Sequence, residues 1–258
     1  MWKFLNENFQ GTSHQRSGAA CQDHSFVTRY GGRCGEALIV VCSDGAGTAA
    51  HSEVGSRLAC HLAKDEVIRY LDSGDELGVV SHDLACEWLK QVNAGMLAEA
   101  VAREISPREL ACTLLVAAIG VSAAVFVQLG DGAIVALEEE EYHPVFWPQS
   151  GEYQNTTNFI TDSAFQSNLQ FKVLQREVLE VSAFTDGLQM LALDYQRRAA
   201  HQPFFSSVFR SLREASDAQD LIVPMRAFLD SPAVNNRTDD DKTLVLATRL
   251  GATTDATV

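Results

Sequence analysis

The stretch that most constrains the fold runs from Leu38 to Thr48 and reads LIVVCSDGAGT. It begins as a short apolar run rich in β-branched residues and stops at Asp44, which small residues flank. Apolar runs of this length that end at glycine are typical of buried strands. The end of such a strand holds a carboxylate rigidly, and the glycines allow backbone carbonyls to approach a bound group. For one stretch alone, a strand followed by an Asp-Gly turn is the simpler alternative.

The same pattern recurs along the chain, and the repetition favours a binding site over a set of unrelated turns. Gly130-Asp131-Gly132 and Thr185-Asp186-Gly187 each follow an apolar strand, and Asp239-Asp240-Asp241 precedes another. Hard divalent cations prefer carboxylate, carbonyl and water oxygens as ligands. The sequence therefore predicts a metal site built from aspartates at strand ends.

The order of the expected elements favours an α+β fold. Strands, two helices, more strands, further helices and a last strand follow one another, and regular strand–helix–strand alternation is absent. Hairpin-rich chains of this kind favour packed antiparallel sheets over a doubly wound parallel sheet. The expected strands are 1–12, 21–27, 38–42, 112–119, 123–129, 133–137, 179–184 and 244–247. The expected helices are 52–71, a helix from the capping residue Ser81 to Ser106-Pro107, 187–198 and 204–230.

No internal repeat or linker divides the chain, so we expect a single domain over residues 1–258. Residues 148–176 are polar and weakly periodic, and we interpret them as a flap beside the site. No segment reaches eighteen consecutive apolar residues, and the N-terminus lacks a signal-peptide pattern. These features predict a soluble, cytoplasmic protein without a membrane partner.

The composition narrows the possible ligands. The formal net charge of −14 argues against nucleic acid, whose phosphates require a basic face. An anionic substrate fits this charge only if bound cations reverse the local potential. The six cysteines form no CxxC pair, so reduced core thiols fit better than a disulfide framework or a zinc site.

Four ordered motifs carry a resemblance to a known family. They are Asp44-Gly45-Ala46-Gly47, Gly130-Asp131-Gly132, Thr185-Asp186-Gly187 and Asp240-Asp241-Lys242-Thr243. In order and rough spacing, the chain resembles the PP2C-type (PPM) metal-dependent serine/threonine protein phosphatases over nearly its whole length. A compact bacterial subgroup is the most similar, through the motifs Gly11-Thr12-Ser13-His14, Cys21-Gln22-Asp23, Gly151-Glu152-Tyr153 and Ser231-Pro232-Ala233-Val234-Asn235. The resemblance implies an α-β-β-α sandwich, with two packed antiparallel sheets flanked by helix pairs.

The resemblance also implies a ligand set. Asp44 takes the place of the aspartate that bridges two Mn²⁺ or Mg²⁺ ions. The Gly45 carbonyl would join one ion, and Asp186 and Asp240 the other. Asp131 resembles the aspartate that serves a third, weaker ion in bacterial members. Two such ions about 3.5–4 Å apart acidify a water and neutralise phosphoryl oxygens, so hydrolysis needs no protein nucleophile.

The chain departs from the family pattern at several positions. Asp23 matches the early acidic residue that orients water at the metals, but Gln22 stands where many members have glutamate. Ala46 replaces the histidine that serves eukaryotic members as a candidate acid for the leaving group. Arg16 is the nearby candidate for the phosphate-binding arginine, with a longer gap than usual. His14 is interpreted as a structural or surface histidine.

The expected activity is therefore metal-dependent hydrolysis of phosphoserine and phosphothreonine esters in proteins. The expected partners are phosphoprotein substrates and a cognate serine/threonine kinase, with the chain acting as a monomer. The alternative is a non-catalytic PP2C-like regulatory module that binds a kinase or phosphoprotein. It is disfavoured because a binding module has no need for carboxylates that repel one another. A calcium-binding structural domain is a third, weaker alternative, because no EF-hand loop is present.

Overall fold

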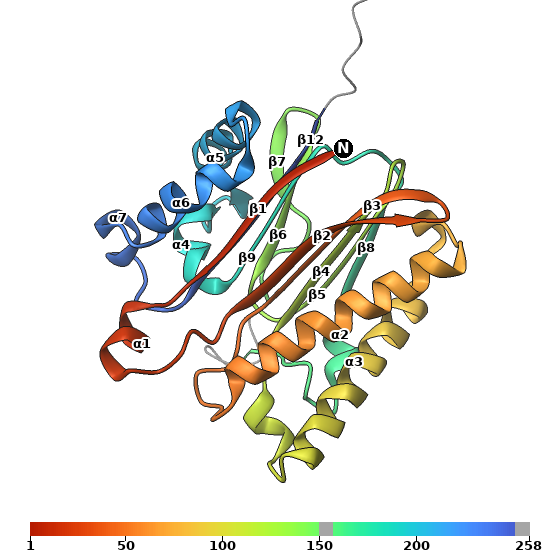
Figure 1. The fold of residues 1–258 in the computed structure, drawn as a ribbon, viewed down its shortest axis with the longest axis vertical. Helices are drawn as coiled ribbons and strands as arrows, with labels where there is room; N and C mark the ends of the chain where they lie inside the picture. Colours follow the sequence, from red (N-terminus) through yellow and green to blue (C-terminus); the bar gives the residue numbers. More distant parts are fainter. Residues whose placement is uncertain (150–156, 251–258) are drawn as a thin grey trace, which may run out of the picture.

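The structure is a computed structural model, and it describes residues 1–149 and 157–250. Two five-stranded antiparallel sheets pack face to face between two layers of helices (Figure 1). The first sheet has the order β1 (Trp2–Phe9), β12 (Lys242–Arg249), β9 (Glu180–Phe184), β6 (Ala133–Glu138), β7 (Glu141–Pro144). The second has the order β2 (His24–Gly32), β3 (Gly35–Ser43), β4 (Leu114–Ile119), β5 (Ala124–Leu129), β8 (Gln170–Leu174). The predicted α+β sandwich is confirmed.

The central core lies between the two sheets. Side chains alternate across a strand, so every second residue of β3 faces the other sheet and the rest face the helices. Leu38, Val40 and Cys42 accordingly belong to the core between the sheets, whereas Ile39 and Val41 belong to the core under the helices. Because β3 is covered on both faces, its sequence is a continuous apolar run rather than an alternating one.

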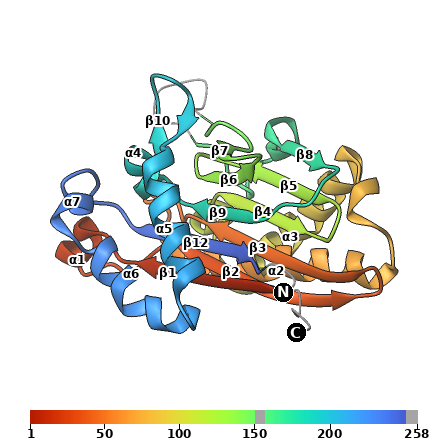
Figure 2. The same cartoon turned by 90° about the horizontal axis from the view of Figure 1, so that it is seen from above.

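Two pairs of longer helices cover the outer faces. α2 (Ser52–Ser73) and α3 (His82–Ala102) pack on the second sheet, and α5 (Gln202–Glu214) and α6 (Ile222–Leu229) on the first (Figures 1 and 2). α2 ends at Gly74, whose left-handed φ of 88° suits glycine. Ser81 caps α3 as predicted, and its side chain accepts a hydrogen bond from the Leu84 amide at 3.2 Å. No helix within the described residues is long and apolar enough to cross a membrane.

Short elements complete the chain. They are α1 (Thr12–Ser17), α4 (Gln189–Ala192) and α7 (Pro232–Asn235), the small hairpin β10 (Leu193–Asp194) and β11 (Ala199–Ala200), and the 3₁₀ turns η1 (Leu77–Val79), η2 (Pro107–Leu110), η3 (Phe165–Asn168), η4 (Asp186–Leu188) and η5 (Ala218–Leu221).

Several predicted boundaries are wrong. The helix expected over 187–198 is only the turn η4 and the four-residue α4, after which the chain enters the β10–β11 hairpin. The helix expected over 204–230 divides into α5 and α6, because the chain leaves helical geometry at Ala215, whose ψ is 135°. α3 ends at Ala102, about one turn before Ser106-Pro107, which instead begins η2.

The predicted flap over 148–176 differs as well. Its last part is β8, which pairs with β5 as an edge strand, and Ile160 and Phe165 are buried under α3 in the core. The middle of that range, 150–156, lies outside the described residues.

Candidate metal centre

The strand register of the first sheet brings three aspartates to the same end of the sandwich. Phe184 of β9 pairs with Leu244 of β12 and with Ala133 of β6. Since these strands are antiparallel, the chain that follows Phe184 lies beside the chain that precedes each partner. Asp186, Asp240 and Asp131 therefore converge, although more than a hundred residues separate the first and last of them in sequence.

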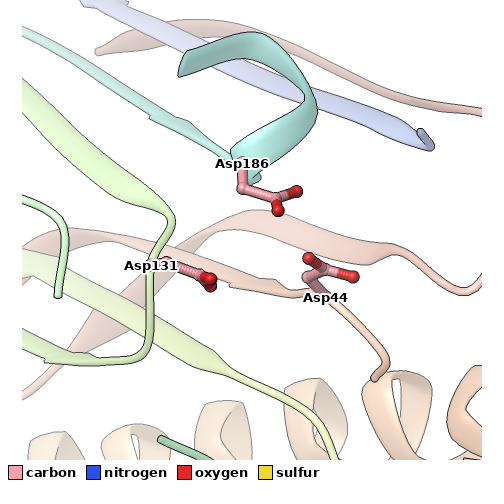
Figure 3. A group of neighbouring side chains, drawn as sticks. All are labelled: Asp44, Asp131 and Asp186. Atoms are coloured by element: carbon pink, nitrogen blue, oxygen red, sulfur yellow. The ribbon is translucent and has the colours of Figure 1, made fainter. Parts of the chain in front are cut away.

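The second sheet contributes Asp44, which directly follows β3. Oxygens of Asp44, Asp131 and Asp186, one from each, all lie within 4.8 Å of one another. Figure 3 shows the three carboxylates pointing toward a common space from three different elements. They line a cavity of about 350 Å³. The other residues around it are Gln22, Gly45, Ala46, Gly47, Thr48, Thr113, Thr157, Phe159 and Asp240.

Backbone contacts fix Asp44. Its amide donates to Thr113 Oγ1 at 2.9 Å, and its carbonyl accepts from the Thr113 amide at 2.8 Å. A Cβ at Gly45 would lie 2.7 Å from Ser52 Cβ and 2.9 Å from the Gln22 carbonyl oxygen. Only glycine fits there, so the turn after β3 can pass close to the start of α2.

The other two carboxylates are also held from behind. Thr157 Oγ1 donates to Asp131 Oδ2 at 2.6 Å, and the Gln189 side chain donates to the Asp131 carbonyl. Asp186 begins η4. A Cβ at the following Gly187 would lie 2.0 Å from the Asp241 carbonyl oxygen, so glycine is required where this turn crosses the loop before β12.

Burial and mutual repulsion raise the pKa values of the cluster. Burial, followed by the charges of Asp131 and Asp240, raises the pKa of Asp186 to about 7. Burial and four neighbouring carboxylates raise the pKa of Asp44 well above its usual range. The pKa of Asp131 is raised chiefly by burial. Without a cation, this group therefore resists carrying its full negative charge.

The surroundings fit a divalent cation. None of the described residues that line the cavity carries a positive charge, so none of them balances the carboxylates. Asp186 Oδ1 is buried and has no hydrogen-bond partner among the described residues. Carboxylate oxygens that face one another, with few proton donors to satisfy them, suit a hard cation.

Asp23 lies deeper than the cavity wall. It is buried, and its Oδ2 accepts a hydrogen bond from Thr185 Oγ1 at 2.7 Å. Thr185 also accepts from the Thr243 amide at 3.0 Å. Burial, with smaller contributions from Asp241 and Asp186, raises the pKa of Asp23 to about 8. Asp23 is therefore coupled to the centre through Thr185 and through charge.

The structure does not bring Arg16 to the carboxylates. Arg16 is exposed on α1, its guanidinium donates to Thr12 Oγ1 at 3.1 Å, and it is not among the residues that line the cavity. α1 instead supports the neighbouring loop, because the Ser13 amide and hydroxyl both donate to the Asp239 carbonyl, at 2.9 and 2.7 Å.

Asp240 lines the cavity but is exposed and stands outside the tight three-carboxylate group. The prediction grouped Asp44 with Asp186 and Asp240, whereas the structure places Asp131 closest to the first two. Sequence reasoning missed Thr113, Thr157 and Thr185, the hydroxyls that hold the aspartates. The sequence offers one hint of these threonines, since Thr185 directly precedes Asp186.

Comparisons with known proteins agree with this geometry. A family model described as Protein phosphatase 2C matches residues 10–226. Serine/threonine-protein phosphatase 3 of Escherichia coli (strain K12) is 35% identical over 249 residues, covering 95% of this chain and 98% of the relative.

Solved structures agree on the fold. The serine/threonine phosphatase Stp1 of Staphylococcus aureus has a TM-score of 0.62 at 15% identity and covers 97% of this chain and 96% of its own. The serine/threonine phosphatase of S. agalactiae has the same TM-score and identity. The alignment covers 97% of this chain and 99% of the S. agalactiae chain. From the family match and the identity to the curated relative, we conclude that this chain belongs to the protein phosphatase 2C family.

Proposed function

We propose that this protein is a Mn²⁺- or Mg²⁺-dependent phosphatase that hydrolyses phosphoserine and phosphothreonine esters in proteins. The observation that carries the proposal is the group of three facing carboxylates in a cavity without a positive side chain. A phosphate monoester is itself an anion, so it enters such a cavity only with cations present. When bound, divalent ions would supply the positive charge for the phosphoryl oxygens and acidify a water.

The protein's own residues have positioning roles in this proposal. Asp44, Asp186 and Asp240, with the Gly45 carbonyl, would hold two ions, and Asp131 would add a ligand for a third. Thr113 fixes Asp44 through paired contacts on its backbone. Asp23, held by Thr185, would act on the attacking water indirectly rather than by direct contact, since it lies behind the cavity wall.

Covalent catalysis by the nearest serine or cysteine does not fit. Ser43 is buried and its hydroxyl donates to the Thr113 carbonyl at 2.5 Å. Cys42 is fully buried, and burial raises the pKa of its thiol well above the usual value, so no thiolate forms near neutral pH. Ala46 provides no acid, and no histidine lines the cavity among the described residues, so we assign protonation of the leaving group to solvent.

Partners follow from the proposed chemistry. Phosphoproteins are the substrates, and a cognate serine/threonine kinase supplies them. We propose a monomer, because a single chain provides the whole candidate ligand set. Light scattering on the purified protein tests the oligomeric state.

The decisive experiment is a phosphatase assay on purified protein after treatment with a chelator. An aryl phosphate and a phosphothreonine peptide are each tested with Mn²⁺, Mg²⁺, Ca²⁺ or no added metal. We expect turnover of both substrates with Mn²⁺ or Mg²⁺ and none without metal. Activity that persists at full rate without metal would reject the proposal, and a protein that binds phosphopeptide without hydrolysis would favour a regulatory module.

A further inference from the structure

A short basic hairpin lies beside the candidate metal centre. β10 and β11 pair Leu193 with Ala200 and Asp194 with Ala199, and the loop between them reads YQRR. In Figure 2 the hairpin projects from the body of the molecule, with α4 at its base and β7 next to it. None of the functional residues considered above comes from this segment.

Hydrogen bonds connect the hairpin to the centre. The Tyr195 hydroxyl donates to the Gln189 side chain, and Gln189 in turn donates to the Asp131 carbonyl. The loop is therefore two contacts away from a residue of the three-carboxylate group.

The loop has a defined shape. Asp194 Oδ1 accepts from the amides of Gln196 and Arg197, both at 3.0 Å. Arg198 closes the loop with a left-handed φ of 51°, which is uncommon for a residue with a Cβ. These contacts define the backbone conformation of the loop.

An aromatic ring positions the Arg198 guanidinium. Arg198 Cζ lies 5.3 Å from the centroid of the Trp147 ring, and the Trp147 and Tyr195 rings meet edge to face at 5.2 Å. A guanidinium over an indole ring is held by cation–π attraction while its N–H groups stay free to donate. Arg198, Trp147 and Tyr195 thus form one stack, which we call the basic rim.

The charge of the basic rim is opposite to that of its surroundings. The whole chain has a net charge of −14, and the neighbouring cavity contains aspartates and no described cation. Arg197 is partly neutralised by Asp194, at 3.3 Å. Within residues 1–149 and 157–250, no carboxylate oxygen lies within 4.0 Å of Arg198. The rim therefore offers an exposed positive charge to an approaching ligand.

Arg198 is not among the residues that line the metal cavity, so its position suits a residue near the phosphorylated side chain rather than the phosphate itself. Arg198 contacts Trp147 at 5.3 Å, Trp147 contacts Tyr195 at 5.2 Å, and Tyr195 is connected to the Asp131 carbonyl through Gln189. An extended peptide advances about 3.3–3.6 Å per residue. We propose that the basic rim binds acidic side chains of a substrate that lie close in sequence to the phosphorylated serine or threonine, with Arg198 as the principal cation. The inference rests on the proposed phosphatase function.

The test uses three phosphothreonine peptides of equal length. One carries aspartates at positions two to four before the phosphothreonine, one carries them at the same positions after it, and the third carries alanines. kcat/KM is measured with Mn²⁺ for wild type, Arg198→Glu, Arg198→Lys and the matched control Arg33→Glu. Arg33 is also exposed, but it lies in the turn before β3, at the far end of that nine-residue strand from Asp44.

We expect the kcat/KM of wild type to be about threefold to tenfold higher for one acidic peptide than for the alanine peptide. A preference of this size is what a few partly exposed ion pairs contribute. Arg198→Glu should remove or invert that preference, and Arg198→Lys should keep most of it. Arg33→Glu should behave as wild type. The preference should weaken between 50 and 500 mM NaCl, because salt screens exposed charges.

The other outcomes overturn the inference in distinguishable ways. If wild type hydrolyses all three peptides equally, or Arg198→Glu lowers all of them and an aryl phosphate alike, the phosphatase function stands and the acidic-substrate assignment is wrong. If wild type with Mn²⁺ or Mg²⁺ hydrolyses no peptide, the proposed function itself fails, and the inference fails with it.

Discussion

The carboxylate of Asp241 lies close to the carboxylates of the candidate metal centre, but its hydrogen-bonding surroundings are the opposite of theirs. Asp241 is buried, and its two oxygens accept hydrogen bonds from the amides of Gly11 and Gln22, each at 2.6 Å. His14 Nδ1 lies 2.9 Å from Asp241 Oδ2. The aspartates of the candidate metal centre instead face one another, and Asp186 Oδ1 has no hydrogen-bond partner among the described residues.

This difference in hydrogen-bond donors distinguishes a structural carboxylate, Asp241, from carboxylates that are candidate metal ligands. Asp241 joins three segments, because it accepts from amides just after β1 and just before β2 and lies against His14 of α1. Donors that point at a carboxylate stabilise its charged form without outside help. Among the facing aspartates, Asp186 Oδ1 has no such donor within the described residues and Asp131 has Thr157, so the charge of the group depends on a bound cation. Both sets occur in aspartate-rich motifs, and only their contacts distinguish them.

The largest effect that tests this distinction is on activity. Asp44→Asn removes one carboxylate from the centre, and we expect turnover with saturating Mn²⁺ to fall by at least about 10³-fold, since metal-based charge stabilisation contributes several kcal/mol. The fold should persist, because relief of repulsion offsets the lost contacts. Turnover and circular dichroism are measured together.

Asp239→Asn is the matched control for Asp44→Asn. Its side chain is exposed in the same loop as Asp240 and does not line the cavity. We expect nearly normal turnover from this control. Near-normal turnover by Asp44→Asn would instead show that the facing carboxylates are not the metal centre.

The second effect is a loss of stability, and it is expected for substitution of Asp241. Asp241→Ala leaves two buried amides without an acceptor, and we expect the free energy of unfolding to fall by about 2–4 kcal/mol. Urea unfolding in the presence of a chelator measures this for Asp241→Ala and Asp44→Asn side by side. Equal destabilisation by the two variants would contradict the distinction drawn here.

The sequence pattern indicated the aspartates of the candidate centre more clearly than the residues that hold the surrounding loops in place. Asp44, Asp131 and Asp186 each follow an apolar strand and directly precede a glycine, and the structure brings these three carboxylates together. Asp241 was passed over, because its role depends on amides more than two hundred residues away in sequence. Long-range contacts of this kind leave no periodic or compositional signal.

The failures in secondary structure have a similar cause. Residues 187–198 contain good helix formers, yet Asp194 accepts from two amides of the next turn and Ala199 pairs with it in β11. Local side-chain hydrogen bonds of this kind compete with helix formation. The strand β8 was hidden because it is an edge strand with partly exposed residues, so its five residues show no clear alternation.

The third effect is the pH dependence of the metal-free protein. The pKa of Asp186 is raised from its usual value near 3.8 to about 7 in the folded state, so the folded protein binds more protons than the unfolded chain between these limits. Unfolding free energy should therefore fall as the pH rises from about 4 to 7. The shift corresponds to about 4 kcal/mol at most, and because Asp186 is partly exposed, solvent screening reduces this to on the order of 2 kcal/mol.

Chelator-treated protein is unfolded with urea at several pH values to measure this dependence. Asp44→Asn should flatten it, and added Mn²⁺ at pH 7.5 should restore stability through binding to the folded state. A metal-free wild-type protein that becomes more stable over this range would show that the carboxylates are neutralised by groups within the chain.

The smallest effect distinguishes Asp131 from Asp240 within the centre. Asp131 belongs to the tight three-carboxylate group, whereas Asp240 is exposed at the cavity wall. Yet Asp131 also has Thr157 as a donor, at 2.6 Å, and so depends less on a cation than Asp44 or Asp186 does. We expect Asp131→Asn to raise the Mn²⁺ concentration for half-maximal activity by on the order of tenfold, equivalent to about 1.4 kcal/mol, with maximal turnover much less affected.

Metal titrations of Asp131→Asn, Asp240→Asn and the Asp239→Asn control give the ranking. If Asp131→Asn abolishes turnover at every Mn²⁺ concentration while Asp240→Asn only shifts the titration, the essential ligands are the three facing carboxylates, and the role assigned to Asp240 by family resemblance passes to Asp131.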